Sequence, residues 1–211
     1  MPLVKIQELE PDVKLALWRV EETPEEMMDK YSCLSSFKSD AEVFKSGARK
    51  MEYLVERALL HSLLNKDIDI LHEESGKPYL DGENGLEISI SHTLRKGKGF
   101  VAIVLSRHGR SGIDIEYQSD RINKIVDKFI REDEKASTTI ERLIIWSAKE
   151  TVYKYFHEQD LQYFEMRCLP FVPMDKGSVV VENLKGGGDL TVGFILDNEY
   201  ILTYAVNVMQ K

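Results

Sequence analysis

The sequence predicts an α+β fold made of two similar lobes. Two stretches, residues 41–64 and 138–157, carry hydrophobic residues at helical spacing, and strand-like runs follow each of them. Each half of the chain thus places a helix before several strands, an order that favours α+β packing. We place the seam between the lobes near residues 107–112, which gives an N-terminal lobe over 1–108 and a C-terminal lobe over 109–211.

A strand and a helix start precede the first long helix. Residues 13–20 form a strand-like run. Thr23 and Pro24 then match the cap and the first position of a helix. From Ala41 to Leu64 the hydrophobic residues recur at helical spacing, which predicts one long amphipathic helix.

Three strands are predicted between the two long helices. The run at 99–106 is hydrophobic almost throughout, as expected for a strand that is covered on both faces. Loops rich in Gly and Pro bound a small element at 79–80. The predicted strands cover residues 86–91, 99–106 and 112–116, with a turn at 108–111 before the last of them.

The C-terminal lobe is expected to end in strands. Helical patterns cover residues 122–129 and 138–157. Three glycines at 186–188 and the Asp-Asn pair at 197–198 give turn signals that separate the runs after these helices. The predicted strands cover residues 178–182, 190–196 and 200–208.

The composition excludes several classes of protein. The 211 residues include 28 Lys and Arg against 36 Asp and Glu, and the net charge of −8 argues against a general nucleic-acid binder. Cys33 and Cys168 fit neither a disulfide framework nor a cysteine zinc site, which is typical of a reducing compartment. The N-terminal residues 1–5 lack a signal-peptide pattern, and the longest hydrophobic run, residues 100–105, is too short to cross a bilayer. We therefore expect a cytoplasmic protein that binds neither nucleic acid nor membrane.

The segment 112–116, Gly-Ile-Asp-Ile-Glu, is the first candidate for chemistry. Alternate side chains of a strand share a face, so Asp114 and Glu116 should point one way and the two isoleucines the other. Two carboxylates about 7 Å apart along a strand could bind one Mg²⁺ on a solvent-facing cleft wall. An ordinary strand with an acidic outer face has the same pattern.

The helix predicted at 138–157 carries the second candidate. Glu150 and Lys154 lie four residues apart and therefore on one helix face. The same spacing stabilises ordinary helices, so it does not indicate a site by itself. The large aromatic residues Trp146 and Tyr153 beside the pair are less typical of a purely solvated face.

Two further groups of residues could bind phosphate. Lys77 lies in a Gly-Lys-Pro turn, and Ser91 and His92 lie where a strand ends. Ammonium, hydroxyl and imidazole groups all donate to phosphate oxygens, although a lone histidine at a strand end is often only structural. The first long helix adds a basic group that could hold another phosphate or simply face solvent: Arg49, Lys50 and Arg57.

Taken together, these segments resemble the 4′-phosphopantetheinyl transferase superfamily. The resemblance rests on their order along residues 49–154, half of the chain: a basic helix, Gly76-Lys77-Pro78, Ser89-Ile90-Ser91-His92, Gly112 to Glu116, and Trp146 to Lys154. The last two segments are similar to the signature blocks of the family. The chain length suits the larger, pseudo-dimeric type (the surfactin-synthetase-activating type), in which two α+β lobes in one chain meet at the active site.

The resemblance implies a reaction and a role for each residue. The family moves 4′-phosphopantetheine from coenzyme A to a serine of an acyl or peptidyl carrier protein and releases adenosine 3′,5′-bisphosphate. Asp114, Glu116 and Glu150 would hold Mg²⁺, and Lys154 would neutralise the leaving phosphate with help from Lys149. Glu150, directly or through a metal-bound water, would accept the serine proton. A set of donors from the first lobe would hold the nucleotide end of coenzyme A: Arg49, Arg57, Lys77, Ser91 and His92.

The partners follow from the same resemblance. Carrier proteins are acidic, so a basic surface that includes Lys124 and Lys128 is a candidate docking surface, with a solvated helix face as the alternative. A single chain would supply both lobes, and we expect a monomer. Two other functions stay open, namely a Mg²⁺-dependent nucleotide phosphohydrolase and a non-catalytic module that binds carrier proteins.

Overall fold

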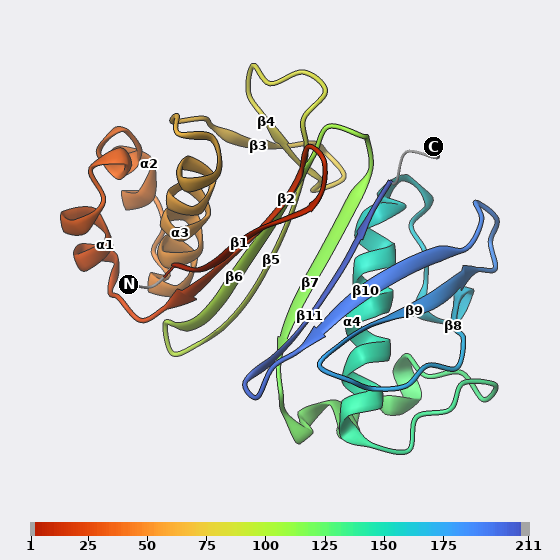
Figure 1. Ribbon diagram of the computed structural model, residues 1–211. Coiled ribbons are helices and arrows are strands. Elements are labelled where there is room, and N and C mark those ends of the chain that lie inside the picture. Colours follow the sequence, from red (N-terminus) through yellow and green to blue (C-terminus); the bar gives the residue numbers. More distant parts are fainter. Residues whose placement is uncertain (1–2, 208–211) are drawn as a thin grey trace. The chain divides into compact units, whose positions relative to one another are not determined.

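The computed structural model describes residues 3–207 and has a mixed α+β architecture, as predicted. The described chain divides into two compact units, one up to residue 109 and one over residues 110–207 (Figure 1). The seam predicted near residues 107–112 contains this division. Each unit has its own hydrophobic core, and each is described by itself below.

The first unit packs one long helix on a four-stranded antiparallel sheet. The sheet has the order β1-β2-β6-β5, and helix α3 packs against its β2, β5 and β6 strands. Buried Leu54 and Ala58 of the helix share a core with Trp18, Val101 and Ile103 of the sheet. The bounds are β1 Leu3–Glu10, β2 Val13–Val20, α3 Gly47–Leu64, β5 Glu87–Arg95 and β6 Lys98–Ser106.

Local signals in the first unit are confirmed at β2 and α1. Strand β2 has the predicted bounds, and helix α1 (Pro24–Lys30) begins after Thr23, whose hydroxyl accepts from Glu26 N–H in a capping box. Strand β1 was not predicted. Neither was the strand that pairs with the small element at 79–80: the structure has a two-stranded sheet there, β3 (Ile70–His72) with β4 (Pro78–Leu80).

The helix predicted over residues 41–64 is confirmed from Gly47 to Leu64, but its predicted start is wrong. The structure has a short helix α2 (Lys38–Glu42), preceded by a 3₁₀ helix at Ser32–Phe37, and then α3 from Gly47. The side chain of Ser46 caps α3 by accepting from the Arg49 N–H, and serine favours caps over helix interiors. Val43 and Phe44, which supported the longer pattern, are exposed in the break between the two helices.

The second unit packs helix α4 on a five-stranded antiparallel sheet. The sheet has the order β7-β11-β10-β9-β8, and α4 lies across it (Figure 1). Buried Leu143 and Val152 of the helix share a core with Val192, Phe194 and Ile201 of the sheet. The bounds are β7 Ser111–Tyr117, α4 Thr139–Tyr155, β8 Met166–Cys168, β9 Lys176–Asn183, β10 Leu190–Leu196 and β11 Tyr200–Val206.

Strands β7, β9, β10 and β11 and helix α4 confirm the predictions within a few residues, and the short strand β8 was not predicted. The last strand was expected to run to Val208, which lies outside the described residues. The α-helix predicted over 122–129 is wrong: two 3₁₀ turns cover Asp120–Lys124 and Val126–Lys128. Ile125 between them has φ −126° and ψ 14°, which interrupts helical geometry.

The two units share an order of elements. In the first, β2 precedes α3, and β2 pairs with β6, which pairs with β5. In the second, β7 precedes α4, and β7 pairs with β11, which pairs with β10. In each unit the strand before the long helix therefore pairs with the last strand of a closing hairpin, and the pseudo-dimeric arrangement of the units stays a prediction.

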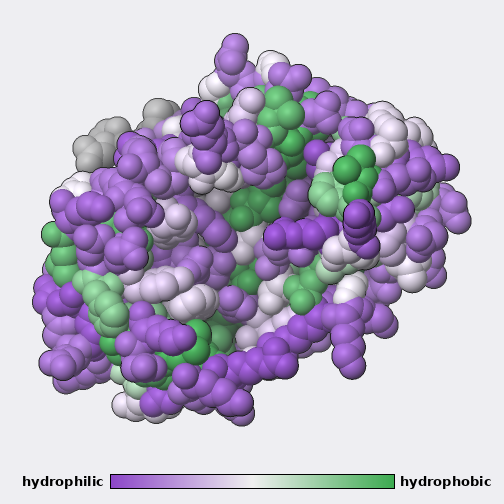
Figure 2. Space-filling view, turned by 180° about the vertical axis from the view of Figure 1, so that it is seen from behind, coloured by the Kyte–Doolittle hydropathy of each residue, from purple (hydrophilic) through white to green (hydrophobic). Residues whose placement is uncertain are grey.

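One face of the described chain is largely hydrophilic (Figure 2). Figure 2 shows one face, on which hydrophilic residues predominate and hydrophobic residues form separate patches. None of the helices within residues 3–207 is both long and apolar enough to cross a membrane.

Candidate active site

Helix α4 crosses strand β7 at Gly112. A Cβ atom placed on Gly112 would lie 2.3 Å from the Thr151 carbonyl oxygen and 3.2 Å from the Tyr155 nitrogen, both backbone atoms of α4. Only glycine therefore permits this separation of helix and strand. Residues on the same face of β7 as Gly112, at 114 and 116, consequently point toward α4.

Asp114 is buried between β7 and α4, with 5% of its surface exposed. Its Oδ2 atom accepts a 2.8 Å hydrogen bond from Ser147 Oγ, and its Oδ1 atom accepts one of 3.0 Å from Lys154 Nζ. Lys154 also donates to the Ile113 carbonyl at 2.8 Å. The expected solvent-facing position is therefore wrong for Asp114, because the helix that carries Lys154 covers the strand.

Each of the other two predicted carboxylates accepts a hydrogen bond from an aromatic side chain. Trp146 Nε1 donates to Glu116 Oε1 at 3.1 Å, and the Tyr163 hydroxyl donates to Glu150 Oε1 at 2.6 Å. The two aromatic rings pack on each other with centroids 5.1 Å apart. A pocket of about 320 Å³ opens beside Glu150, and Tyr163 lines it as well.

The three carboxylates influence one another electrostatically. Burial, together with the charges of Asp114 and Glu150, raises the pKa of Glu116 to about 7, against the opposing effect of the Trp146 hydrogen bond. Burial and the charge of Asp114 also raise the pKa of Glu150, although the hydrogen bond from Tyr163 acts in the opposite direction. A cation placed among these groups would relieve this repulsion.

The donor set suits a hard cation such as Mg²⁺. Within residues 3–207 no three His, Cys, Asp or Glu side chains already form a group that could hold a metal ion. Magnesium usually needs only one or two carboxylates, with waters and substrate phosphates completing its shell. Any two of Asp114, Glu116 and Glu150 would meet that requirement, and the mutual repulsion of the three carboxylates favours a bound cation.

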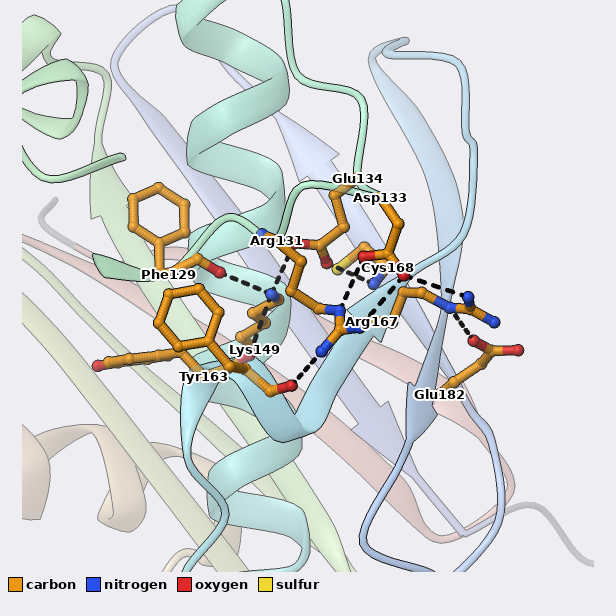
Figure 3. A network of polar contacts seen from close by, with 10 residues as sticks. Phe129, Arg131, Asp133, Glu134, Lys149, Tyr163, Arg167, Cys168 and Glu182 are labelled. Atoms are coloured by element: carbon orange, nitrogen blue, oxygen red, sulfur yellow. Dashed lines mark hydrogen bonds and ion pairs between the residues drawn. The ribbon is translucent and has the colours of Figure 1, made fainter. Parts of the chain in front are cut away.

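The structure corrects the role expected for Lys149. Its side chain is fully buried and lies at the centre of a polar network (Figure 3). The ammonium donates to Glu134 Oε2 at 2.8 Å, to the Phe129 carbonyl at 2.7 Å and to the Tyr163 carbonyl at 3.1 Å. All three N–H groups are used inside the protein, so Lys149 does not neutralise a phosphate here.

Four of the residues predicted to bind coenzyme A lie on α3, β5 and the turn before β4 of the first unit. Glu52 of α3 accepts from Arg49 at 2.9 Å and lies 3.5 Å from His92 Nδ1 of β5, so it brings these two residues together. Lys77 forms an ion pair of 2.7 Å with Glu87. Ser91, next to His92, is buried, with 6% of its surface exposed.

Arg57 does not fit the predicted phosphate-binding role. It is buried with 7% exposure, and its guanidinium stacks on the Tyr53 ring at 3.4 Å and donates to the Tyr53 carbonyl at 3.2 Å. Burial lowers the pKa of Arg57. Helix α3 therefore directs Arg57 into its packing with neighbouring residues, whereas Arg49, two turns earlier, is exposed.

A known protein family matches the segment of the chain that carries these carboxylates and Lys154. Residues 110–205 match the family model of the 4′-phosphopantetheinyl transferase superfamily. The match covers a little under half of the chain and nearly all of the second unit, including both signature segments. No curated protein matches the chain. The family resemblance is thus confirmed for residues 110–205, and the larger pseudo-dimeric type stays a prediction.

Within residues 110–205, sequence reasoning missed three residues that surround the carboxylates and a fourth, Glu134, that holds the buried Lys149. Ser147 and Thr203 hydrogen-bond each other at 2.9 Å beside Asp114. Ser147 lies in the signature segment and could have been found there, because it is one turn from Glu150. Thr203 lies on β11 opposite Asp114, and Tyr163 and Glu134 lie in connecting segments, so only the folded chain brings Thr203 and Tyr163 to the carboxylates and Glu134 to Lys149.

Proposed function

We propose that this protein transfers 4′-phosphopantetheine from coenzyme A to a serine of an apo acyl or peptidyl carrier protein, with release of adenosine 3′,5′-bisphosphate. The observation that carries the proposal is the arrangement of Asp114, Glu116, Glu150 and Lys154 between β7 and α4. These residues lie inside the segment that matches the 4′-phosphopantetheinyl transferase superfamily. A strand and a helix that pack only for structure have no need of three carboxylates that repel one another.

In the proposed reaction, Asp114, Glu116 and Glu150 would hold Mg²⁺. The chemistry supplied by a bound Mg²⁺ would be neutralisation of the diphosphate charge of coenzyme A and polarisation of its phosphorus–oxygen bonds. Trp146 restrains the Glu116 carboxylate, because its N–H group occupies one carboxylate oxygen.

Lys154 and Glu150 have the chemical roles in this proposal. The serine oxygen of the carrier protein bonds to the phosphorus that bears pantetheine, and the bond from that phosphorus to the bridging oxygen breaks. Lys154, held beside Asp114, stabilises the negative charge that develops on the departing bisphosphate. Glu150, directly or through a metal-bound water, accepts the serine proton, and burial and the charge of Asp114 raise its pKa.

The nucleotide end of coenzyme A carries the diphosphate and a 3′-phosphate. Binding these anions needs positively charged hydrogen-bond donors. We assign this role to Arg49, Lys77, Ser91 and His92. Support for it comes from the Glu52 carboxylate, which brings Arg49 and His92 together. We also propose that a single chain carries out the reaction.

The proposal is tested by incubating the protein with coenzyme A, Mg²⁺ and an apo carrier protein, followed by intact-mass measurement. We expect the carrier to gain the mass of one phosphopantetheine. Release of phosphate without a modified carrier would indicate the hydrolase alternative, and binding without either product would indicate a binding module.

A lysine variant makes the test specific to the site. Lys154→Ala should lower turnover about 10²–10³-fold, because one preorganised charge is typically worth about 3–4 kcal/mol in the transition state. Affinity for coenzyme A should fall less than turnover. Lys135→Ala, at an exposed position in the same unit, is the matched control and should keep wild-type turnover. Equal losses in affinity and turnover would show that Lys154 only binds the ground state.

A further inference from the structure

Tyr163 lies beyond the signature segments and has no part in the chemical roles assigned above. It is in the segment that follows α4, thirteen residues after Glu150, and its hydroxyl donates a 2.6 Å hydrogen bond to Glu150 Oε1. Among the described residues, Tyr163 is the one side chain that hydrogen-bonds Glu150. This short bond to a carboxylate belongs to the stronger class of hydrogen bonds in proteins.

The backbone of Tyr163 is held in place by the buried ion pair. Lys149 Nζ donates to the Tyr163 carbonyl at 3.1 Å and to Glu134 Oε2 at 2.8 Å, and the side chains of this pair are 0% exposed (Figure 3). Glu134 Oε1 in turn accepts from the Cys168 N–H of β8 at 2.7 Å. The carbonyl of Tyr163 is therefore tied to α4 and β8 at once.

The ring of Tyr163 is held separately by Trp146. The centroids of the two rings are 5.1 Å apart with an interplanar angle of 31°, and Trp146 also packs edge-on against Phe129. The Tyr163 hydroxyl thus has little freedom, because the residue is restrained at its backbone and at its ring. Glu150, by contrast, is a flexible side chain whose orientation this hydroxyl can fix.

We propose that Tyr163 is a positioning residue that holds the Glu150 carboxylate in the orientation in which it acts. This inference rests on the function proposed above, since it concerns the same carboxylate. The hydroxyl binds Oε1 of Glu150. Because this bond fixes the orientation of the carboxylate, it also fixes the direction in which Oε2 points. Lys149 and Glu134 support this geometry from the interior without touching the carboxylate themselves.

Two substitutions separate the hydroxyl from the ring. Tyr163→Phe removes the hydrogen bond and keeps the ring against Trp146 and the carbonyl beside Lys149. Tyr163→Leu removes both. The matched control is Tyr155→Phe, which deletes a phenol hydroxyl from α4 itself, where the Tyr155 ring packs on Phe156. If Tyr163 only filled space, Tyr163→Phe and Tyr155→Phe would both behave like the wild type.

The measurements are the kcat and KM of carrier modification, thermal melting, and Mn²⁺ affinity followed by electron paramagnetic resonance in the presence of coenzyme A. For Tyr163→Phe we expect kcat to fall about tenfold, because the bond that orients the charged carboxylate is lost. We expect a Mn²⁺ affinity several-fold weaker, a KM for the carrier within about twofold of wild type, and an unchanged melting temperature.

An unchanged kcat for Tyr163→Phe would overturn the inference, and so would an unchanged Mn²⁺ affinity. A loss of kcat that occurs only in Tyr163→Leu would assign Tyr163 a packing role instead. The failure of the proposed function itself looks different, because the wild-type protein would then modify no carrier at all.

Discussion

At the scale of single residues, the contact between Gly112 and α4 determines how closely the helix approaches β7 and hence how near Lys154 lies to Asp114. A Cβ atom at residue 112 would meet the Thr151 carbonyl oxygen at 2.3 Å, and neither backbone can move without displacing the other. Gly47, the first residue of α3, differs in this respect, because a Cβ atom added there would meet nothing within 4 Å.

Gly112→Ala should therefore lower the free energy of unfolding by about 1–3 kcal/mol through overpacking. Gly47→Ala is the control and should be neutral or stabilise by about 0.5–1 kcal/mol, since alanine favours helix more than glycine does. Urea denaturation of both variants measures the difference. Equal stabilities would contradict the close approach of α4 and β7.

Glu56 of α3 shows how burial makes stability depend on pH. Its pKa is raised to about 7, first by desolvation and then by the charge of Glu52, against the opposing charges of Arg57 and Arg49. Between the ordinary value of 4.5 and this value, the folded protein binds a proton that the unfolded chain has lost. Stability therefore falls as pH rises through this range.

We expect the wild type to lose about 1–2 kcal/mol of stability between pH 5 and pH 8 that Glu56→Gln does not lose. Urea denaturation at both pH values gives the difference. Glu74→Gln, which changes an exposed carboxylate of the first unit, should keep the wild-type pH dependence. Parallel pH profiles for wild type and Glu56→Gln would refute the assignment.

At the scale of elements, the sequence predicted the bounds of helices and strands best where a few neighbouring residues carry the whole hydrophobic or capping pattern. The bounds of β2 and β10 and the cap at Thr23 followed directly from sequence. The break before α3 did not, because Val43 and Phe44 continue a helical spacing that the Ser46 cap interrupts.

Such patterns did not predict whether a positively charged side chain points to solvent or to the interior. Arg57 and Lys149 are charged residues on helices, and sequence reasoning took both to face a phosphate, but tertiary packing turns them inward. Tyr163 was missed for a related reason, since no motif marks it and only the fold brings it to Glu150. Strand and helix periodicities, in contrast, placed Asp114 with Glu116 and Glu150 with Lys154. In the structure Lys154 donates to Asp114, while burial, the charge of Asp114 and that of the nearby Glu150 raise the pKa of Glu116.

The buried pair of Lys149 and Glu134 joins α4 to the segments around it, and its loss should affect the whole second unit. Glu134→Gln leaves the Lys149 charge uncompensated in the interior, so we expect a loss of about 3–5 kcal/mol in unfolding free energy. Asp133→Asn is the neighbouring control: its partners Arg131 and Arg167 are only partly buried, so the substitution should change stability far less. Similar losses in chemical denaturation would show that the buried pair has no special role.

At the scale of the whole molecule, the charge balance predicts that Mg²⁺ and coenzyme A bind cooperatively. The net charge of −8 and the carboxylates of Asp114, Glu116 and Glu150 repel a diphosphate until a cation neutralises them. Linkage then requires that each ligand tighten the other by the same factor, typically about 5–150-fold. Calorimetric titration of coenzyme A with and without Mg²⁺, and of Mg²⁺ with and without coenzyme A, measures both factors.

Sedimentation under the same conditions should show a monomer, because one chain supplies every residue that the proposal uses. Identical affinities in the paired titrations would remove Mg²⁺ from the proposal, and activity confined to an oligomer would show that a second copy contributes to the site.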